Sequence, residues 1–248
     1  KPCDTYSFNQ LIKEHRVDRE KAFIIGVGCK GKLSIEKIRE QGIKGIESIT
    51  GAEMTDDAET LFHEWYSIDD DRDWTYLSHN KPQSILQCID YFKKLSECSH
   101  SIHLAVTDKN DNLVKGIFSV DNIDCDNGVF ELADVNWTPQ MKRTRVSTES
   151  IYLVLSLFFN KLGYRRCEWR TNIYNEDAIK SANRLGFTHE GILRDKKITK
   201  GYSVDISVFS VTSGDWPGIN DALIAWLRKE NFDERGRQIR HLSDFYLP

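Results

Sequence analysis

The sequence predicts an α+β fold in three layers, in which a mixed, mostly antiparallel twisted sheet is flanked by helices. In the middle of the chain, three segments with strand character are separated by turns rich in Asn, Asp and Gly, at 108–111 and 124–128. Such turns are typical of antiparallel hairpins. Further along, segments with helical spacing alternate with strands, so helices and sheet are expected to share one core.

The expected elements follow one another from residue 44 to residue 231. Strands are expected at 44–50, 103–107, 113–120, 129–137, 165–171, 191–198 and 203–211. Helices are expected at 56–66 with Thr55 as N-cap, at 82–97, through the apolar positions 151–162, at 176–185 closed by Gly186, and at 219–231. Residues 232–248 form a mostly polar tail that ends in aromatic residues.

The first forty residues carry helical spacing at 6–16 and 33–40 and a short apolar strand at 22–27. Between the strand and the second helix, the sequence reads Gly-Val-Gly-Cys-Lys-Gly-Lys32-Leu33. A phosphate-binding P-loop needs Ser or Thr after the lysine, because that hydroxyl binds the magnesium ion. Leu33 stands there instead, so we favour a simple turn, with nucleotide hydrolysis as a minor alternative.

Composition bounds the class of protein. The chain has 248 residues, of which 40% are hydrophobic and 29% charged, as in soluble globular proteins. The net charge of −4 and the isoelectric point of about 6.0 do not predict a nucleic-acid partner. The length allows one large domain, or one domain with an appendage.

Cysteine usage and hydropathy narrow the class further. The six cysteines include no C-x-x-C pair, which argues against zinc ribbons and disulfide scaffolds, so we expect reduced thiols and no metal. No apolar run approaches the roughly 20 residues of a membrane span. We expect a cytoplasmic protein, without a membrane partner, that is a monomer or a homodimer.

A cationic loop before the helix at 151–162 points to a phosphate-bearing ligand. The strand at 129–137 meets Pro139, which cannot continue a sheet ladder. The loop that follows contains Lys142, Arg143 and Arg145. Backbone N–H groups at a helix N-terminus attract anions, and these side chains add positive charge.

An ordered set of residues resembles the GNAT acetyltransferases. The set comprises Trp137-x-Pro139, Gln140-x-x-Arg143-Thr144, Thr148-Glu149, Cys167-Glu168-Trp169-Arg170, Asn175, Leu185-Gly186-Phe187, Glu190-Gly191-x-x-Arg194, Lys200-Gly201 and Trp216-Pro217. Within that superfamily, the sequence looks like the branch of the ribosomal-protein N-terminal acetyltransferases. The resemblance implies a GNAT domain at 43–217, with an N-terminal extension at 1–42 packed on it and a C-terminal helix and tail at 218–248.

The resemblance also implies acetyl-CoA as donor and a primary amine as acceptor, either a protein N-terminus or a small cationic amine. Attack would be direct, in a ternary complex. The family's Gln/Arg-x-x-Gly-x-Gly/Ala loop matches Gln140, but Arg143 and Arg145 stand where the glycines usually are. Glycine is used where no side chain fits, so these arginines make a close approach of the loop backbone to the diphosphate less certain to form. By resemblance, the cofactor-binding residues are Val135, Asn136, Trp137, Gln140, Lys142, Arg143, Thr144, Arg145 and Asn175.

The resemblance also implies that a carboxylate on the strand at 129–137 acts as the general base, directly or through water. Simple alternation places Leu132, Asp134 and Asn136 on one face and Glu131, Ala133, Val135 and Trp137 on the other. We favour Asp134 as the base, with Glu131 second, although either could be an ordinary hydrogen-bonded carboxylate.

The acid that protonates the leaving thiolate is less well defined. Asn175 matches a family asparagine and is also a good N-cap. The branch commonly has Ser at the position of Ala178, so Tyr174, Ser181 or water would have to serve. His103 and His189 are interpreted as structural.

An acidic run at 69–73 precedes two aromatic residues and suggests an amine-binding segment. Acidic side chains beside aromatic rings attract cations. The candidates are Asp70, Asp71, Trp74 and Tyr76. A solvated loop is the alternative, and a GNAT-fold module that binds CoA without turnover is the alternative to an enzyme.

Overall fold

The computed structural model describes residues 22–27, 46–48, 51–98, 100–108 and 111–246, with the backbone alone before residue 56. The helices expected at 6–16 and 33–40 lie outside these residues. Most of the P-loop-like stretch, 28–33, lies outside them too.

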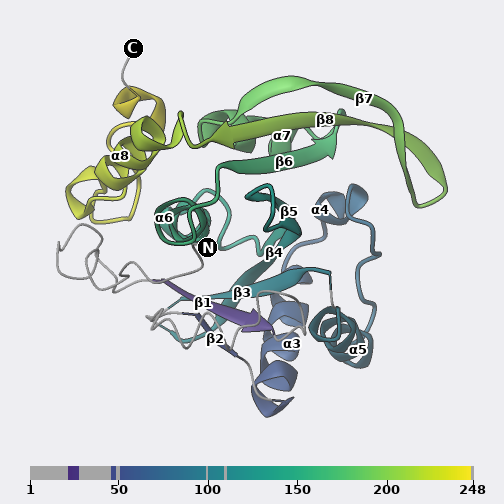
Figure 1. Cartoon of the computed structure of the whole chain (residues 1–248). Helices are drawn as coiled ribbons and strands as arrows, with labels where there is room; N and C mark the ends of the chain where they lie inside the picture. The colour runs from purple at the N-terminus through teal and green to yellow at the C-terminus, as the bar shows by residue number, and fades with distance from the viewer. Residues whose placement is uncertain (1–21, 28–45, 49–50, 99, 109–110, 247–248) are drawn as a thin grey trace.

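One eight-stranded sheet forms the middle layer, in the order β2-β1-β3-β4-β5-β6-β8-β7 (Figure 1). Its β1–β2 and β5–β6 pairs are parallel and the others antiparallel, which confirms the mixed, mostly antiparallel sheet. The strands are β1 (Ala22–Val27), β2 (Ile46–Ser48), β3 (Ile102–Asp108), β4 (Val114–Asp124), β5 (Val129–Trp137), β6 (Arg166–Asn172), β7 (Thr188–Thr199) and β8 (Tyr202–Thr212).

Helices cover both faces and complete the three layers (Figure 1). One core joins the sheet to α6 and α8, and a second joins β3 and β4 to α3 and α5. The helices are α3 (Gly51–Trp65), α4 (Arg72–Thr75), α5 (Ile85–Ser96), α6 (Arg145–Ser156), α7 (Glu176–Arg184) and α8 (Trp216–Trp226), with a π turn η1 (Leu157–Lys161) after α6 and short 3₁₀ turns η2 (Lys229–Asn231) and η3 (Leu242–Phe245).

Several boundaries differ from the sequence prediction. Helix α3 begins at Gly51, so Thr55 lies inside the helix and is not its N-cap. The C-terminal helix begins at Trp216 and ends at Trp226, several residues earlier at each end than predicted. Strand β1 falls within the predicted extension and pairs with both β2 and β3 of the sheet.

A β-bulge interrupts β5 at its centre. Ala133 is opposite Ser119 and Asn136 is opposite Ile117, so two residues of β5 face one residue of β4. One of the two, Asp134, has a left-handed backbone with φ of 48°. An extra residue reverses the side-chain alternation beyond it.

The predicted alternation of β5 is therefore wrong. Leu132, Val135 and Trp137 all contact the core under α6. Asn136 instead lies opposite Ile117, which belongs to the core under α3 and α5. Alternation alone could not reveal the bulge, because the sequence has no glycine at this point.

Strands β5 and β6 separate just before the bulge. Their parallel pairing ends at Leu132 opposite Trp169, although β5 continues to Trp137 and β6 to Asn172. Beyond Leu132, no described strand pairs with β5 on its β6 side, so its backbone N–H and C=O groups there are available to a ligand.

The last two strands form a long hairpin at the end of the sheet. Between Leu193 and Lys197 the register shifts, and Asp195 adopts φ of 48°. The backbone N–H of Asp195 donates to the Asp205 carboxylate at 2.8 Å. The hairpin extends past β6 above α4 (Figure 1).

Gly116 allows β4 to pass close to the end of β5. A Cβ at this position would lie 2.5 Å from Cε3 of Trp137 and 3.0 Å from the Asn136 carbonyl oxygen. Those distances are shorter than a carbon contact permits, so the strand end that carries the candidate site depends on this glycine.

We predict that Gly116→Ala lowers the free energy of unfolding by about 1–3 kcal/mol, because the methyl group displaces the Trp137 ring. Urea denaturation measures the difference. Gly218→Ala is the matched control: nothing lies within 4 Å of a Cβ there, and the residue is in helix α8. Its stability should be unchanged or higher by up to about 1 kcal/mol. Equal losses in both variants would contradict the close approach.

Candidate active site

The separation of β5 from β6 leaves an open strand edge along three of the residues predicted to bind the cofactor. Val135, Asn136 and Trp137 follow the bulge, on the stretch without a β6 partner. The side chain of Asn136 is 2% exposed, and neither its Nδ2 nor its Oδ1 has a hydrogen-bond partner. Unpartnered buried polar atoms are costly, so they mark a position where a ligand or water would be bound.

The loop between β5 and α6 is held by its own backbone. The carbonyl of Thr138 accepts hydrogen bonds from the N–H groups of Met141 and Lys142, at 3.0 and 3.2 Å. Thr144 caps α6: its Oγ1 accepts from the Ser147 N–H at 3.4 Å and donates to the Met141 carbonyl at 2.7 Å. The remaining N–H groups of the first turn have no acceptor within the helix.

Arg143 has a backbone conformation that glycine favours. Its φ is 61°, in the left-handed region that glycine occupies freely and other residues rarely adopt. Its side chain is exposed. The loop thus retains the shape of a glycine loop and adds a cation on its outside.

The other loop residues already have neighbours. The Lys142 ammonium forms a very short ion pair with Asp73 of α4. The Oε1 of Gln140 accepts from Lys115 at 3.5 Å. Arg145 is buried, with its guanidinium 5.4 Å from the Phe232 ring centre and its Nε and Nη2 without hydrogen-bond partners.

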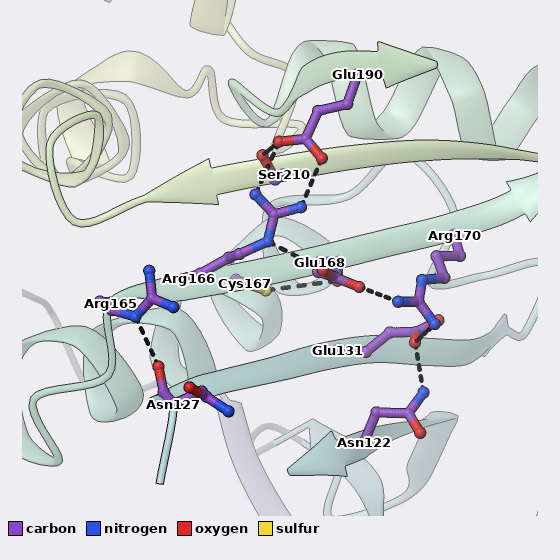
Figure 2. Close-up of polar contacts among 10 residues, drawn as sticks. All are labelled: Asn122, Asn127, Glu131, Arg165, Arg166, Cys167, Glu168, Arg170, Glu190 and Ser210. Carbon is purple, nitrogen blue, oxygen red and sulfur yellow. Dashed lines mark hydrogen bonds and ion pairs between the residues drawn. The ribbon is translucent and has the colours of Figure 1, made fainter. Parts of the chain in front are cut away.

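Glu131 belongs to a row of ion-paired side chains from β5, β6 and β7 (Figure 2). Its Oε2 accepts a hydrogen bond from Asn122 at 2.7 Å and lies 3.4 Å from Arg170. Arg170 also pairs closely with Glu168, and Glu168 with Arg166 at 2.9 Å. This ion-pair row ends at Glu190, whose carboxylate accepts from Arg166 at 2.7 and 2.5 Å and from Ser210 at 2.7 Å.

Asp134, in contrast, has no ion pair with a basic side chain among the described residues. Burial raises the pKa of its carboxyl group, and the negative charge of Asp121 raises it further. Burial also lowers the pKa of His103, which keeps that imidazole neutral. The charge of Asp134 adds to burial in raising the pKa of Tyr91 on α5. These groups from β3, β4 and α5 interact with a buried carboxylate whose pKa is raised, which makes it a stronger base than an exposed carboxylate.

The predicted amine-binding residues have different surroundings in the structure. Asp70 accepts two hydrogen bonds from the Arg72 guanidinium, at 2.9 and 2.6 Å, and Asp71 pairs with Lys81 at 2.7 Å. Trp74 is 3% exposed, its ring 4.8 Å from Trp65 in an edge-to-face contact. It is a core residue and offers no face to a ligand.

Tyr76 ties the same segment to the start of α7. Its hydroxyl donates to the Tyr174 carbonyl at 2.8 Å. The phenol of Tyr174 is itself 73% exposed. Asn175 caps α7, accepting from the Ala178 N–H at 3.2 Å, and the Ser181 hydroxyl donates to the Asp177 carbonyl at 2.7 Å.

Sequence reasoning missed the residues that the fold brings beside Asp134 and α4. Asp121 and Tyr91 carry no motif, and His103 was interpreted as structural. Lys200 lies in the β7–β8 turn and donates to the Trp74 carbonyl at 2.5 Å. The signal for Lys200 in the sequence is that it belongs to the Lys200-Gly201 pair of the family resemblance.

We predict that Arg166→Gln lowers the free energy of unfolding by about 1–3 kcal/mol, because Glu168 and Glu190 lose a shared cation. The hydrogen bonds from Arg166 lower the pKa of Glu190 to about 2. Because the pKa of Glu190 is lower in the folded protein than the unfolded value of 4.5, its ionised form stabilises the fold at pH above 4.5. The difference in free energy of unfolding between wild type and Arg166→Gln should therefore shrink as pH falls from 4.5 toward 2.

Urea denaturation at several pH values measures this difference. Arg165→Gln is the control, since Arg165 is exposed and donates to one carbonyl, that of Asn127 at 2.7 Å. It should cost no more than about 0.5 kcal/mol. A pH-independent difference for Arg166→Gln would contradict the contribution of Glu190.

Within the described part of the chain, no helix combines the length and apolar character needed to cross a membrane. Among the same residues, no group of three or more His, Cys, Asp or Glu side chains is arranged to hold a metal ion.

Known proteins resemble this chain in sequence and structure. A crystal structure of a GCN5-related N-acetyltransferase from Brucella melitensis is 33% identical in sequence, with a TM-score of 0.74. The match covers 77% of this chain and 86% of the Brucella chain. SPbeta prophage-derived uncharacterized N-acetyltransferase YokL of Bacillus subtilis is 31% identical over 106 residues, and the uncharacterized N-acetyltransferase p20 of Bacillus licheniformis is 31% identical over 72 residues. The matches span 58% of YokL and 40% of p20.

A family model described as an acetyltransferase (GNAT) domain matches residues 52–188, more than half of the chain. The match includes α3, the bulged strand β5, the loop before α6 and the cap of α7. The chain therefore belongs to the GNAT acetyltransferase family.

Proposed function

We propose that this protein transfers the acetyl group of acetyl-CoA to a primary amine, by direct attack of the amine in a ternary complex. The observation that carries the proposal is the bulge of β5 at Asp134, next to the stretch of that strand that has no β6 partner. This neighbourhood supports a proton acceptor and backbone donors acting on the same substrate. Acyl transfer to an amine needs both.

The residues present fit the diphosphate of acetyl-CoA. The first turn of α6 offers N–H groups and a positive helix end. Arg143 gives the loop a glycine-like backbone and an exposed guanidinium. Close approach of a phosphate is compatible with this loop, because the arginine side chain leaves the backbone conformation unchanged.

Catalysis by this chain would use three of its features in turn. Backbone N–H groups at 135–137 that face the open edge of β5 polarise the thioester carbonyl and stabilise the oxyanion. Asp134 accepts a proton from the ammonium group of the acceptor, directly or through water, which leaves a nucleophilic amine. Asp134 suits this step better than Glu131, because Glu131 is engaged by Asn122 and Arg170.

Protonation of the leaving thiolate is assigned to solvent. Asn175 and Ser181 are engaged with the backbone of α7, Ala178 has no polar group, and the Tyr174 phenol is mostly exposed. The thiolate of CoA is a good leaving group, so loss of a dedicated acid does not prevent turnover.

The acceptor is proposed to be a protein N-terminus or a small cationic amine, as in the ribosomal-protein N-terminal acetyltransferase branch. Release of thiol from acetyl-CoA should be followed with Ser- and Ala-initiated peptides, polyamines, aminoglycosides and amino acids. Release that depends on one amine class supports the enzyme and names the class. CoA binding without release from any of these amines would favour the catalytically silent module.

We predict that Asp134→Asn lowers kcat by about 100-fold or more, because the amide cannot accept the proton, while the affinity for CoA changes little. In the wild type, the acid limb of the rate profile should lie above the usual carboxylate range, since burial raises the pKa of Asp134. Activity rises as pH rises through that pKa and the base loses its proton. An unchanged kcat in Asp134→Asn, with a loss in Glu131→Gln, would transfer the role to Glu131.

We predict that Arg143→Gly weakens CoA binding by about three- to tenfold, because one phosphate contact is lost. Glycine adopts φ of 61° without strain, so the stability of the variant should be unchanged or higher by up to about 1 kcal/mol. Isothermal titration with CoA and urea denaturation test the two statements. Unchanged CoA affinity would count against this placement of the diphosphate.

A further inference from the structure

The Lys142–Asp73 ion pair connects the two halves of the proposed site. Lys142 lies in the loop before α6, two residues ahead of the N-cap Thr144. Asp73 lies 69 positions earlier, in α4. This helix belongs to the segment 69–81, which begins with the acidic run 69–73. One ion pair thus joins the loop proposed for the diphosphate to the segment predicted for the amine.

Asp73 differs from its acidic neighbours in the origin of its partner. Asp70 and Asp71 pair with Arg72 and Lys81, both of which belong to the same segment. Those two carboxylates remain paired whether or not the loop before α6 changes. Asp73 alone among the three depends on a cation from outside the segment, and that cation is a primary ammonium.

The pair is accessible to water and therefore exchangeable. The side chain of Lys142 is 36% exposed and that of Asp73 is 31% exposed. Ion pairs at this exposure contribute little net stability, because water and salt compete for both groups. A diphosphate beside the N-terminus of α6 carries more negative charge than one carboxylate and would attract the Lys142 ammonium more strongly.

Asp73 would remain in place after Lys142 departs, because other contacts fix α4. The ring of Trp74 is buried against Trp65 and also contacts Tyr91 edge-on at 6.2 Å. Lys200 donates to the Trp74 carbonyl at 2.5 Å, and Lys197 donates to the Ser78 hydroxyl at 3.0 Å. The backbone that carries Asp73 is therefore held from both sides.

We propose that Lys142 exchanges Asp73 for the cofactor diphosphate, and that the released Asp73 then binds a cationic group of the acceptor. Asp73 is thus a specificity-determining residue, and Lys142 occupies its carboxylate until the cofactor arrives. Acetyl-CoA is expected to bind before the acceptor. This inference rests on the proposed function, since it requires the diphosphate at the loop before α6.

The first test measures CoA affinity by isothermal titration. Asp73→Asn should bind CoA three- to tenfold more tightly than the wild type, because Lys142 no longer has to leave a carboxylate. Lys142→Gln should bind CoA more weakly, and Asp73→Asn should bring no gain in that background. Asp90→Asn is the control for loss of one negative charge, because Asp90 forms an exposed pair with Lys94 on α5. Its CoA affinity should equal that of the wild type.

The second test uses the amine that releases thiol in the panel above. Asp73→Asn should raise the KM for that amine at least fivefold and leave kcat within twofold, whereas a merely structural defect would lower kcat and stability. Initial rates at varied concentrations of both substrates should fit ordered addition with acetyl-CoA first.

The outcomes separate the two proposals. A wild-type protein that binds no CoA overturns the proposed function and this inference with it. Normal CoA binding and turnover, with unchanged CoA affinity and amine KM in Asp73→Asn, overturns only the exchange of Lys142. Tighter CoA binding with an unchanged amine KM overturns the role of Asp73 toward the acceptor.

Discussion

The interruption of hydrogen bonding between β5 and β6 is the constraint on which the candidate site depends. Four residue pairs hold the two strands together, and the pairing stops at Leu132 and Trp169. The bulge at Asp134 follows immediately, and the charge of this carboxylate adds to burial in raising the pKa of Tyr91 on α5. A regular ladder would have satisfied the backbone groups of β5 internally and left nothing for a thioester carbonyl. The site is therefore a consequence of pairing that the sheet does not complete.

Local sequence patterns predicted most helices and strands, but not the residues where the backbone departs from regular geometry. Strand β5 has the bounds that alternation and Pro139 predict, and Gly186 ends α7 in a left-handed conformation. The bulge could not be foreseen, because Asp134 is neither glycine nor a recognised turn residue in its context. The bulge becomes visible only in the pairing of β5 with β4, where two residues of β5 face one residue of β4, and that pairing is tertiary information.

The candidate site was predictable as far as it is encoded in consecutive residues. The loop before α6 was predicted as a phosphate-binding segment from its order of residues, and in the structure Arg143 of that loop has the left-handed backbone that glycine favours. Ion pairs between distant segments were not predictable, since nothing in the sequence pairs Asp73 with Lys142. Charge runs specify which groups are near each other along the chain, and only the fold decides which partner each group obtains.

The register shift near Asp195 affects how the outer edge of β7 can pair with other chains. β7 is the outermost strand of the sheet on its side, and most of its residues are exposed. A long, flat edge of this kind offers unpaired backbone groups to any other extended chain. The displaced residues near Asp195 twist the edge, and Lys196 and Lys197 place charge beside it. The register shift and these charges discourage pairing of this edge with another extended chain.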